Sequence, residues 1–475
     1  LWTIASPFIL FIILCILIYL PPIQNFLVDK AAVYASEATG MNISVGRISL
    51  SFPLNLVVTD VDAASPHKDT LLSVRRLQVN VQLLPLLKKQ VEVDGISLQG
   101  ATVNSNDLIH GMRLNGTLGE LFISSHGVAL DPETAIVNKV LLKDTDLSLC
   151  LNDTAAADTA ASDPTYWKII LQDIDLQNVS FALDMPLDSL SLAASLDNAT
   201  LRDGLIDLHK SAYSLQTFRI KNGRVRYDSG RPSATASADS LSAGLDPSHI
   251  ALTDIGVKLD SLYYEGRNMK AVISQFVLKE RSGVEIVSTE GRLVSNDKVL
   301  RVPSLKLETR DSYLELNAAM DWDALDFKKE GLVSARLMAD IGKPDVVRFM
   351  GSMDEKFIRK YPSEPLRIRT GIDGDLNKLK LTTLTAELPG ALELFAKGEL
   401  TSLTDSLLRG GDITLQAETK DLKFISTLAE GIEIPYGTRL EGKFTMAGPK
   451  MGTDLLLMQP EAHAVAAADT IPVSY

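Results

Sequence analysis

The residue types that most often carry chemistry are few and scattered in this chain. The six histidines are His67, His110, His126, His209, His249 and His463. None of them has the spacing of a metal-binding helix such as H-E-x-x-H. Cys15 lies in an apolar stretch and Cys150 in a strand-like one, so both are interpreted as small buried hydrophobes. Two cysteines cannot build a disulfide framework. We expect no metal site.

Motifs for nucleophilic or phosphate chemistry are also missing from the sequence. It contains no G-x-S-x-G turn, no G-x-x-x-x-G-K-[ST] loop and no G-x-G-x-x-G after a strand. The closely spaced acids Asp173 and Asp175, and Asp354 and Glu355, are interpreted as solvated positions. The sequence therefore predicts no catalytic residue and no cofactor, and the protein is not expected to be an enzyme.

Composition limits the classes of partner. Lys and Arg number 47 and Asp and Glu 60 in 475 residues, for a formal net charge of -13. Nucleic-acid binding usually needs a basic surface, so no nucleic-acid partner is expected. The hydrophobic content of 45% allows one large core or several small ones.

Residues 1–20, LWTIASPFILFIILCILIYL, have no charged side chain. About 20 apolar residues match a hydrocarbon core about 30 Å thick, which predicts a transmembrane anchor. Trp2 and Tyr19 lie near its two ends, where aromatic rings favour the membrane interface. A cleaved signal peptide is the alternative, but Pro21-Pro22 follows instead of a small-residue cleavage site.

The segments at the two ends of the chain carry further expectations. Residues 22–40 have the i, i+3, i+4 spacing of an amphipathic helix, with Gly40 as its C-cap. Residues 451–475 are expected to form an irregular tail. The chain begins with Leu1 rather than Met, and no terminating structure is evident at its end, so we expect a piece of a longer protein.

From Met41 onward the dominant period is two, which predicts short antiparallel strands. In RRLQVNVQLLPLL, Leu77, Val79, Val81 and Leu83 fall on one side of a strand, and Arg76, Gln78, Asn80 and Gln82 on the other. Leu392 and Leu394 alternate in the same way in ALELFAKGEL.

The stretch TFRIKNGRVRYD predicts a hairpin that turns at Asn222-Gly223. Closing it there places Ile220 opposite Val225 and Phe218 opposite Tyr227 on an apolar face. The other face then carries facing pairs of cations, Arg219 with Arg226 and Lys221 with Arg224. Neighbouring acids or an anionic partner should offset that repulsion.

The remaining chain is divided by composition. Residues 41–152 are predicted to form a first β-unit, residues 153–165 a low-complexity loop, and residues 166–450 a continuing β-region. Short helices are expected near residues 344–360 and 421–431.

The apolar strand faces must be covered, because each inward aliphatic side chain gains roughly 1.5–3 kcal/mol on leaving water. Two solutions fit: two sheets with a dry core, or one curved sheet forming a trough with an apolar interior. Aromatic residues are only 6% of the chain, and aliphatic walls accept acyl chains well. In the second case Leu77, Val79, Val81, Leu83, Phe218, Ile220, Val225, Leu392 and Leu394 are expected to face acyl chains.

The apolar segment and a short helix ending in Thr39-Gly40 are followed, in this order, by the segments ISVGRISLSFPLNLVVTDV, TLLSVRRLQVNV and PLLKKQVEVDGISLQGATVN. This arrangement over residues 8–104 resembles the N-terminal part of TamB-like proteins (translocation and assembly module subunits) and the wider AsmA-like superfamily of the Gram-negative cell envelope. A looser β-rich similarity continues to about residue 445.

The resemblance implies a fold and two functions. The fold is a mainly β protein: an N-terminal transmembrane helix followed by a long curved, antiparallel-rich sheet that forms an apolar-lined groove (a β-taco), with a few short amphipathic helices. Such a chain is held in the bacterial inner membrane by a single pass, with most of it in the periplasm, and carries phospholipid toward the outer membrane. The alternative is a scaffold for outer-membrane protein assembly or protein secretion, with a barrel partner of the TamA/Omp85 type that binds a C-terminal region not present here.

Overall fold

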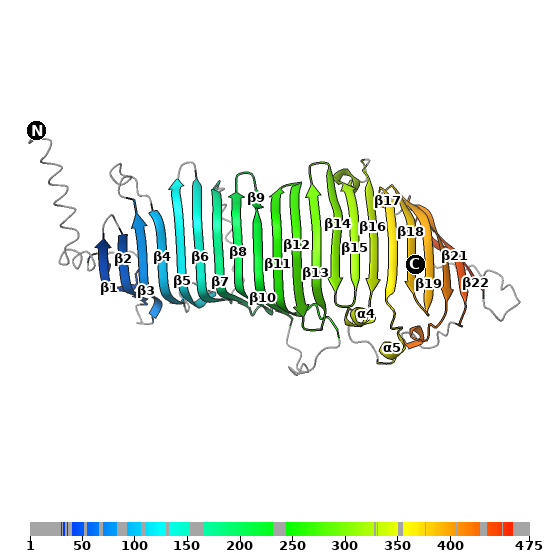
Figure 1. Cartoon of the computed structure of the whole chain (residues 1–475), viewed down its shortest axis with the longest axis horizontal. Helices are drawn as coiled ribbons and strands as arrows, with labels where there is room; N and C mark the ends of the chain where they lie inside the picture. Colours follow the sequence, from blue (N-terminus) through cyan, green and yellow to red (C-terminus); the bar gives the residue numbers. More distant parts are fainter. Residues whose placement is uncertain are drawn as a thin grey trace, which may run out of the picture. The chain divides into compact units, whose positions relative to one another are not determined.

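In the computed structural model the described part of the chain is mainly β, with 22 strands joined in one sheet and few helices (Figure 1). The structure describes residues 40–51, 55–65, 70–82, 93–105, 111–129, 133–152, 166–230, 244–326, 331–349, 355–375, 377–403, 407–427, 435–448 and 450–458, and the isolated positions 30, 32, 33, 36 and 329. No described helix is long and apolar enough to cross a bilayer. The predicted anchor at residues 1–20 lies outside the described residues, as does most of the predicted helix at 22–40.

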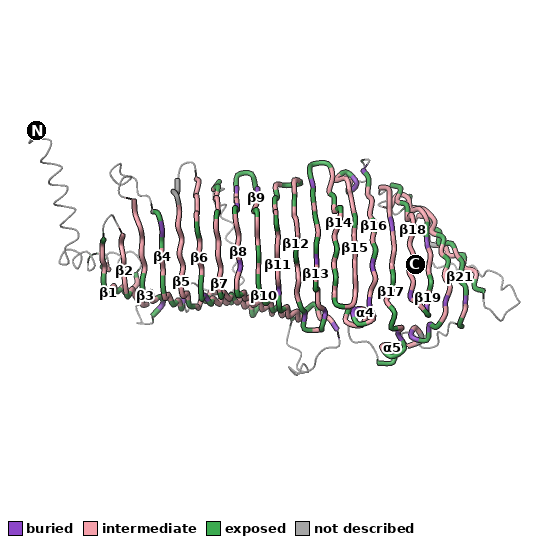
Figure 2. Tube along the Cα trace, in the orientation of Figure 1, coloured by how far each residue is buried: buried purple, intermediate pink, exposed green. Residues whose placement is uncertain are grey.

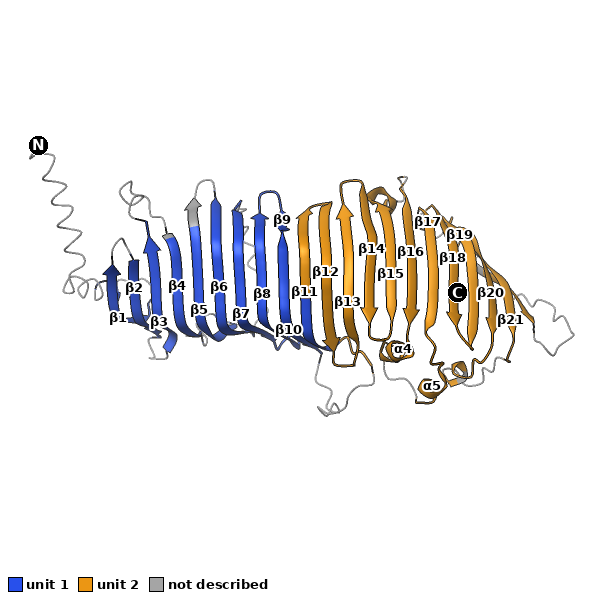
Figure 3. Ribbon diagram, in the orientation of Figure 1, with its two compact units in different colours: residues 1–233, 248–256 blue, residues 234–247, 257–475 orange. Residues whose placement is uncertain are grey.

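The chain divides into two compact units, shown in Figure 3. Unit 1 comprises residues 1–233 and 248–256, and unit 2 comprises residues 234–247 and 257–475. The strands of unit 1 are β1 Asn42–Ser51, β2 Asn55–Ala64, β3 Thr70–Val81, β4 Val93–Asn104, β5 Met112–Ala129, β6 Thr134–Leu151, β7 Lys168–Met185, β8 Leu190–Asp207, β9 Ala212–Leu215 and β10 Thr217–Ser229; β11 His249–Glu265 begins in unit 1 and ends in unit 2.

The paired strands from β1 to β10 run antiparallel, with one exception. The pairs from β1 to β6 are antiparallel, as are those of β7 with β8 and of β8 with both β9 and β10. The exception is β6 with β7, which run parallel from Thr134 opposite Lys168 to Cys150 opposite Asp184. A parallel pair needs a crossover connection in place of a hairpin. The predicted low-complexity loop at 153–165 connects these two strands and lies outside the described residues.

The predicted hairpin at residues 217–228 is wrong. These residues form the single strand β10, which pairs along its length with β8, so that Ile220 lies opposite Ala199 and Val225 opposite Ala194. Asn222 does have the positive φ of a turn residue, at 52°, but it lies inside the strand. The expected facing cations are therefore not opposite one another. Arg224 pairs with Asp197 at 3.5 Å, and Arg226 with Asp228 at 2.7 Å.

Asn222 belongs to a row of residues that crosses unit 1 from strand to strand, here called the seam. The seam consists of Gly46, Asp60, Arg75, Gly100, Gly119, Asp144, Asn178, Asp197 and Asn222. Each of these residues falls between two paired positions of its strand. Positive φ occurs at Asp60 (55°), Gly100 (62°), Asp144 (49°), Asn178 (52°) and Asn222 (52°). These five lie on β2, β4, β6, β7 and β10, which all run in one direction. Gly, Asn and Asp tolerate this left-handed conformation best.

The seam shifts the alternation of side chains by one residue. On either side of it successive side chains alternate between the two faces, but across it residues three apart share a face. Ile220, Gly223 and Val225 line the same hollow, and a Cβ built on Gly223 would lie 3.2 Å from Ile220 Cγ2. Without the seam, Ile220 and Gly223 would point to opposite faces.

Unit 2 contains an antiparallel series of strands. They are β12 Asn268–Glu280, β13 Glu285–Ser295, β14 Val299–Thr309, β15 Tyr313–Asp321, β16 Val333–Ile341, β17 Leu366–Gly374, β18 Lys378–Leu388, β19 Leu392–Thr401, β20 Gly410–Thr419, β21 Arg439–Ala447 and β22 Lys450–Met458. Consecutive strands pair antiparallel from β12 to β22. Strand β22 is a correction to the predicted tail at 451–475, because Gly452 to Met458 pair with β21.

Short helices lie at the strand ends of unit 2. They are η1 Trp322–Leu325, α4 Lys343–Phe349, α5 Glu355–Lys360 and η2 Ile425–Thr427. Helix α5 brings Phe357 and Tyr361 against Phe424, with ring centroids 5.2 to 5.8 Å apart. Leu388, Ala391 and Leu422 complete this buried cluster. Helices α4, α5 and η2 fall in or next to the regions where the sequence predicted short helices, near 344–360 and 421–431, whereas η1 was not predicted.

Burial raises the pKa of the Tyr361 phenol, whose residue is 6% exposed. A raised pKa in the folded state means that this group's stabilisation is complete below about pH 10, the unfolded value, and is lost as pH rises further. We expect Tyr361→Phe to make the alkaline loss of stability shallower, by at most about 1.4 kcal/mol per pH unit. Urea unfolding followed from pH 8 to 11 checks this. Tyr436→Phe, at a 73% exposed site, is the control and should change nothing.

Candidate functional site: the apolar rows

Cross-strand pairing in unit 1 aligns apolar residues into four rows, two on each side of the seam. Row 1 is Leu50, Leu56, Val79, Ile96, Ile123, Val140, Ile174, Leu201 and Phe218. Row 2 is Ile48, Val58, Leu77, Leu98, Leu121, Leu142, Leu176, Ala199 and Ile220. Both rows contain one residue from each strand between β1 and β10, except the short β9. Eight steps between strands at about 4.8 Å give each row a length of about 38 Å.

The other two rows lie beyond the seam. Row 3 is Val45, Val61, Val74, Ala101, Leu118, Thr145, Val179, Leu196 and Gly223. Row 4 is Ile43, Ala63, Leu72, Val103, Gly116, Leu147, Phe181, Ala194 and Val225. None of the four rows contains a charged residue, and Thr145 is their one polar side chain. The seam makes this possible, because it returns the apolar positions of both strand halves to the same face.

Most residues of these rows are only half-buried, as Figure 2 shows along the strands of unit 1. Three are exposed: Ile96 at 36%, Leu72 at 38% and Phe181 at 38%. A second layer packed face to face on a sheet would bury such side chains almost completely. Among the described residues of unit 1, the rows therefore remain accessible over much of their length.

A hollow of about 230 Å³ lies over rows 2 to 4 between β7 and β11, here called the Gly223 hollow. Its lining is Val179, Phe181, Ala194, Ser195, Leu196, Ile220, Gly223, Arg224, Val225 and Ile255. Eight of these ten residues are apolar or glycine. The hollow lies where the small side chain of Ala194, in row 4, stands between Phe181 and Val225 on the neighbouring strands.

Unit 2 has the same kind of rows. Row 5 is Leu305, Leu316, Leu337, Thr370, Leu384, Ala396, Leu415, Gly442 and Leu455. Row 6 is Leu307, Leu314, Ala339, Ile368, Ala386, Leu394, Ala417, Leu440 and Leu457. In unit 2, β-bulges keep the apolar side chains of both strand halves on the same face, for example between Val302 and Leu305 of β14 and between Leu381 and Leu384 of β18.

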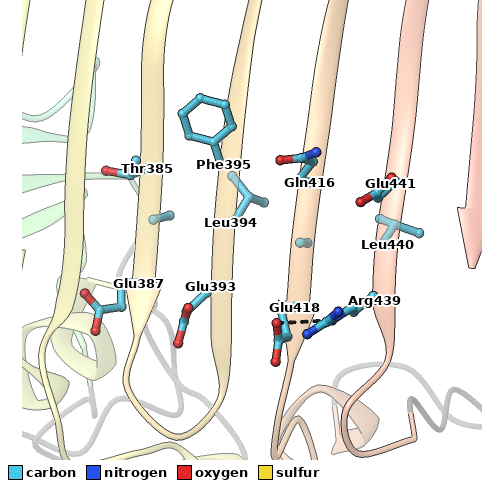
Figure 4. A pocket seen from close by; sticks show the side chains of 12 residues that line it. Thr385, Glu387, Glu393, Leu394, Phe395, Gln416, Glu418, Arg439, Leu440 and Glu441 are labelled. Atoms are coloured by element: carbon cyan, nitrogen blue, oxygen red, sulfur yellow. Dashed lines mark ion pairs between the residues drawn. The ribbon is translucent and has the colours of Figure 1, made fainter. Parts of the chain in front are cut away.

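A larger hollow, of about 580 Å³, lies on β18 to β21, and four of its twelve lining residues are glutamates. Figure 4 shows Glu387, Glu393 and Glu418 side by side on neighbouring strands, with Arg439 next to Glu418. These acids are paired with cations: Arg367 with Glu387 and Arg439 with Glu418 at 3.3 Å, and Lys420 with Glu393 at 2.7 Å. An exposed ion-paired surface of this kind is a poor site for an apolar ligand, so size alone does not identify the site.

The residues singled out from the sequence occupy different places. Leu77, Val79, Phe218, Ile220, Val225 and Leu394 lie in the rows. Val81 pairs with Val93 beyond an irregularity at Asn80. Leu392 instead packs against the aromatic cluster of α5. Leu83 lies outside the described residues.

Sequence reasoning missed most of the row residues, although a signal was present. In several strands two apolar residues three apart flank an Asp, Asn, Gly or Arg-Arg pair, as Val58 and Val61 flank Asp60, and Val74 and Leu77 flank Arg75-Arg76. A strict period of two assigns such residues to opposite faces. When a residue with positive φ, or the residue opposite it on the neighbouring strand, lies between the two apolar residues, both apolar side chains lie on one face.

The described residues contain no group of three or more His, Cys, Asp or Glu side chains arranged to hold a metal ion. Comparison with known proteins found no matching family model, no similar curated protein and no similar solved structure. The apolar rows are therefore the candidate site on their geometry alone.

Proposed function

We propose that the protein is a non-enzymatic conduit for phospholipid, in which acyl chains lie along the apolar rows of a curved, groove-forming sheet. In this proposal residues 1–20 anchor the chain in the bacterial inner membrane, and the sheet projects into the periplasm toward the outer membrane. The single observation that carries the proposal is the continuity of rows 1 to 4, which cross nine strands without a charge.

The energetics of lipid movement support such a surface. A diacyl lipid has about 30 methylenes, each worth about 0.8 kcal/mol on leaving water, so extraction into bulk water costs on the order of 20 kcal/mol. Along an aliphatic row each step exchanges one apolar contact for another, and this cost largely disappears. Leucine, valine and isoleucine form most of the rows, and their branched side chains offer no polar group that would hold a headgroup.

Two sequence features add support. The uncharged apolar segment at residues 1–20 would place the start of the sheet beside a source of lipid. The order of sequence segments over residues 8–104 resembles that of TamB-like and AsmA-like proteins of the cell envelope, for which the same role is expected. The two features share the N-terminal region, whereas apolar rows occur in each of the two units.

An assembly scaffold for outer-membrane barrel proteins is a second candidate, and one observation favours it. Strand β22 pairs with β21 on one side, and no described strand lies on its other side. A free strand edge can add a strand from another chain by β-augmentation. In this case a barrel protein of the TamA/Omp85 type or its nascent strands would be the partner, and crosslinks should concentrate on β22.

Site-specific photo-crosslinking in cells tests the leading proposal. A crosslinker at Val79, in row 1, should capture phospholipid, because its neighbours Leu56 and Ile96 are apolar. The matched control is Gln78, on the opposite face of the same strand between Val57 and Ser97. We expect at least tenfold more lipid adduct at Val79 than at Gln78.

The same experiment has two outcomes that contradict the proposal. Equal capture at Val79 and Gln78 would mean that the adducts come from the bulk membrane. Capture confined to Gln78 would mean that the rows are covered by protein in the cell. Mass spectrometry of the gently extracted chain gives an independent readout, since a conduit should retain phospholipid and a dry β-sandwich should not.

A further inference from the structure

We propose that the Gly223 hollow is a fixed station at which a stretch of lipid acyl chain is held, rather than one more part of a uniform surface. This inference rests on the proposed lipid function and adds a specific binding site to it. Elsewhere in rows 3 and 4 most positions carry side chains large enough to fill the space above the sheet. On β8 Ala194 does not, and the hollow opens there, between Phe181 and Val225.

The size of the hollow fits part of an acyl chain. Its volume of about 230 Å³ exceeds that of an engineered apolar cavity of about 150 Å³ that binds benzene. Phe181 at its edge is 38% exposed although it lies in an apolar row, so an occupant would cover a ring that the described residues leave accessible. Ile255 from β11 is buried and closes the hollow on the side opposite Phe181.

The chemistry of the lining favours hydrocarbon over peptide. Arg224 directs its guanidinium to Asp197, at 3.5 Å, and Ser195 is the only other polar residue of the lining. The backbone groups of β7, β8 and β10 are engaged in the strand ladders. A peptide inserted here would leave its own N–H and C=O groups without partners, at a large desolvation cost. An acyl chain has no such groups.

The hollow is built into the fold by the seam. Asn222 has a φ of 52° and shifts the alternation, which brings Gly223 and Val225 to the same face as Ile220. The Asn222 amide also donates to Asp197 at 3.0 Å on the neighbouring strand. Because the backbone sets the shape, the station exists before a lipid arrives, and its position should be the same for every lipid that passes.

A filling substitution with a matched control tests the station in the full chain in cells. Ala194→Phe adds a ring in row 4 at the hollow. Ala193→Phe adds the same ring to the preceding residue of β8, which lies between Ala182 and Arg226. A photo-crosslinker at Ile220 reports lipid at the hollow, and one at Val79 reports lipid at a distant position of row 1. We expect Ala194→Phe to lower phospholipid capture at Ile220 at least fivefold while capture at Val79 changes less than twofold. Ala193→Phe should change neither.

The outcomes separate the station from the conduit. Lipid capture at Val79 with none at Ile220, or capture at Ile220 that Ala194→Phe leaves unchanged, overturns the station alone. No lipid at either position overturns the proposed function as well. Capture of a peptide or of a second copy of the chain at Ile220 also overturns the station. If Ala194→Phe lowers the amount of folded protein, Ala194→Leu is used, and the same fall at Ile220 is required of it.

Discussion

Replacing Leu98 with Asp should abolish lipid binding at the neighbouring row position Val79 without unfolding the protein. Leu98 lies in row 2, between Leu77 and Leu121. A short carboxylate there cannot reach past its neighbours to water once a lipid tail covers the row, and an unpaired buried charge costs several kcal/mol. Each 1.4 kcal/mol is a factor of ten in binding, so we expect at least a hundredfold loss of phospholipid captured by a photo-crosslinker at Val79. Mass spectrometry of the extracted protein measures it.

Ser97→Asp is the matched control for this experiment. Ser97 is the preceding residue of β4, faces the other way and pairs with Gln78 and Phe122. It should retain lipid as the unsubstituted chain does. If the rows instead met a second sheet in a dry core, Leu98→Asp would bury its charge permanently and the protein would unfold. A folded Leu98→Asp variant that still captures lipid at Val79 would contradict the conduit.

The sequence was a sufficient guide to the fold class but not to the register. Short alternating stretches such as Leu77 to Val81 predict strands, and the structure is mainly β. The Asn222-Gly223 pair is a strong local signal for a hairpin, yet it lies inside β10. Local sequence favours a left-handed residue at Asn222 in both cases. Only pairing with the distant strand β8 decides whether that residue turns the chain or forms part of the seam.

Long-range contacts explain the other differences. Leu392 alternates with Leu394 in the sequence, but the aromatic cluster of α5 and η2 packs against it, and those residues are separated from it by tens of positions. The parallel pairing of β6 with β7 depends on the route of the connection between them, for which composition gives no rule. The rows depend on how each strand aligns with its neighbours, because the shift in side-chain alternation at the seam hides them in the sequence of any single strand.

A second large effect is expected at Asp345, whose side chain is 1% exposed at the start of α4. Its carboxylate accepts hydrogen bonds from the Thr309 hydroxyl, from Ser312 Oγ at 2.6 Å and from Arg348 Nη1 at 3.0 Å. Arg348 also donates to Asp311 at 2.9 Å. Burial opposes the charged form of Arg348, but the hydrogen bonds to Asp311 and Asp345 outweigh it, so the pKa of Arg348 is raised. Asp345 thus ties helix α4 to the turn between β14 and β15.

Asp345→Ala should therefore destabilise this part of unit 2 by about 3–5 kcal/mol, because it leaves a partly buried guanidinium and two hydroxyls without their shared acceptor. Asp345→Asn keeps the shape and some of the hydrogen bonds, so its loss should be about 1–3 kcal/mol. Glu355→Ala, which removes an exposed pair with Arg359, should cost less than about 1 kcal/mol. Hydrogen exchange of residues 309–312 and of α4 measures these losses locally, which is necessary because a chain of two units need not unfold in one step. Equal exchange in Asp345→Ala and Glu355→Ala would show that the buried carboxylate is not what holds α4 in place.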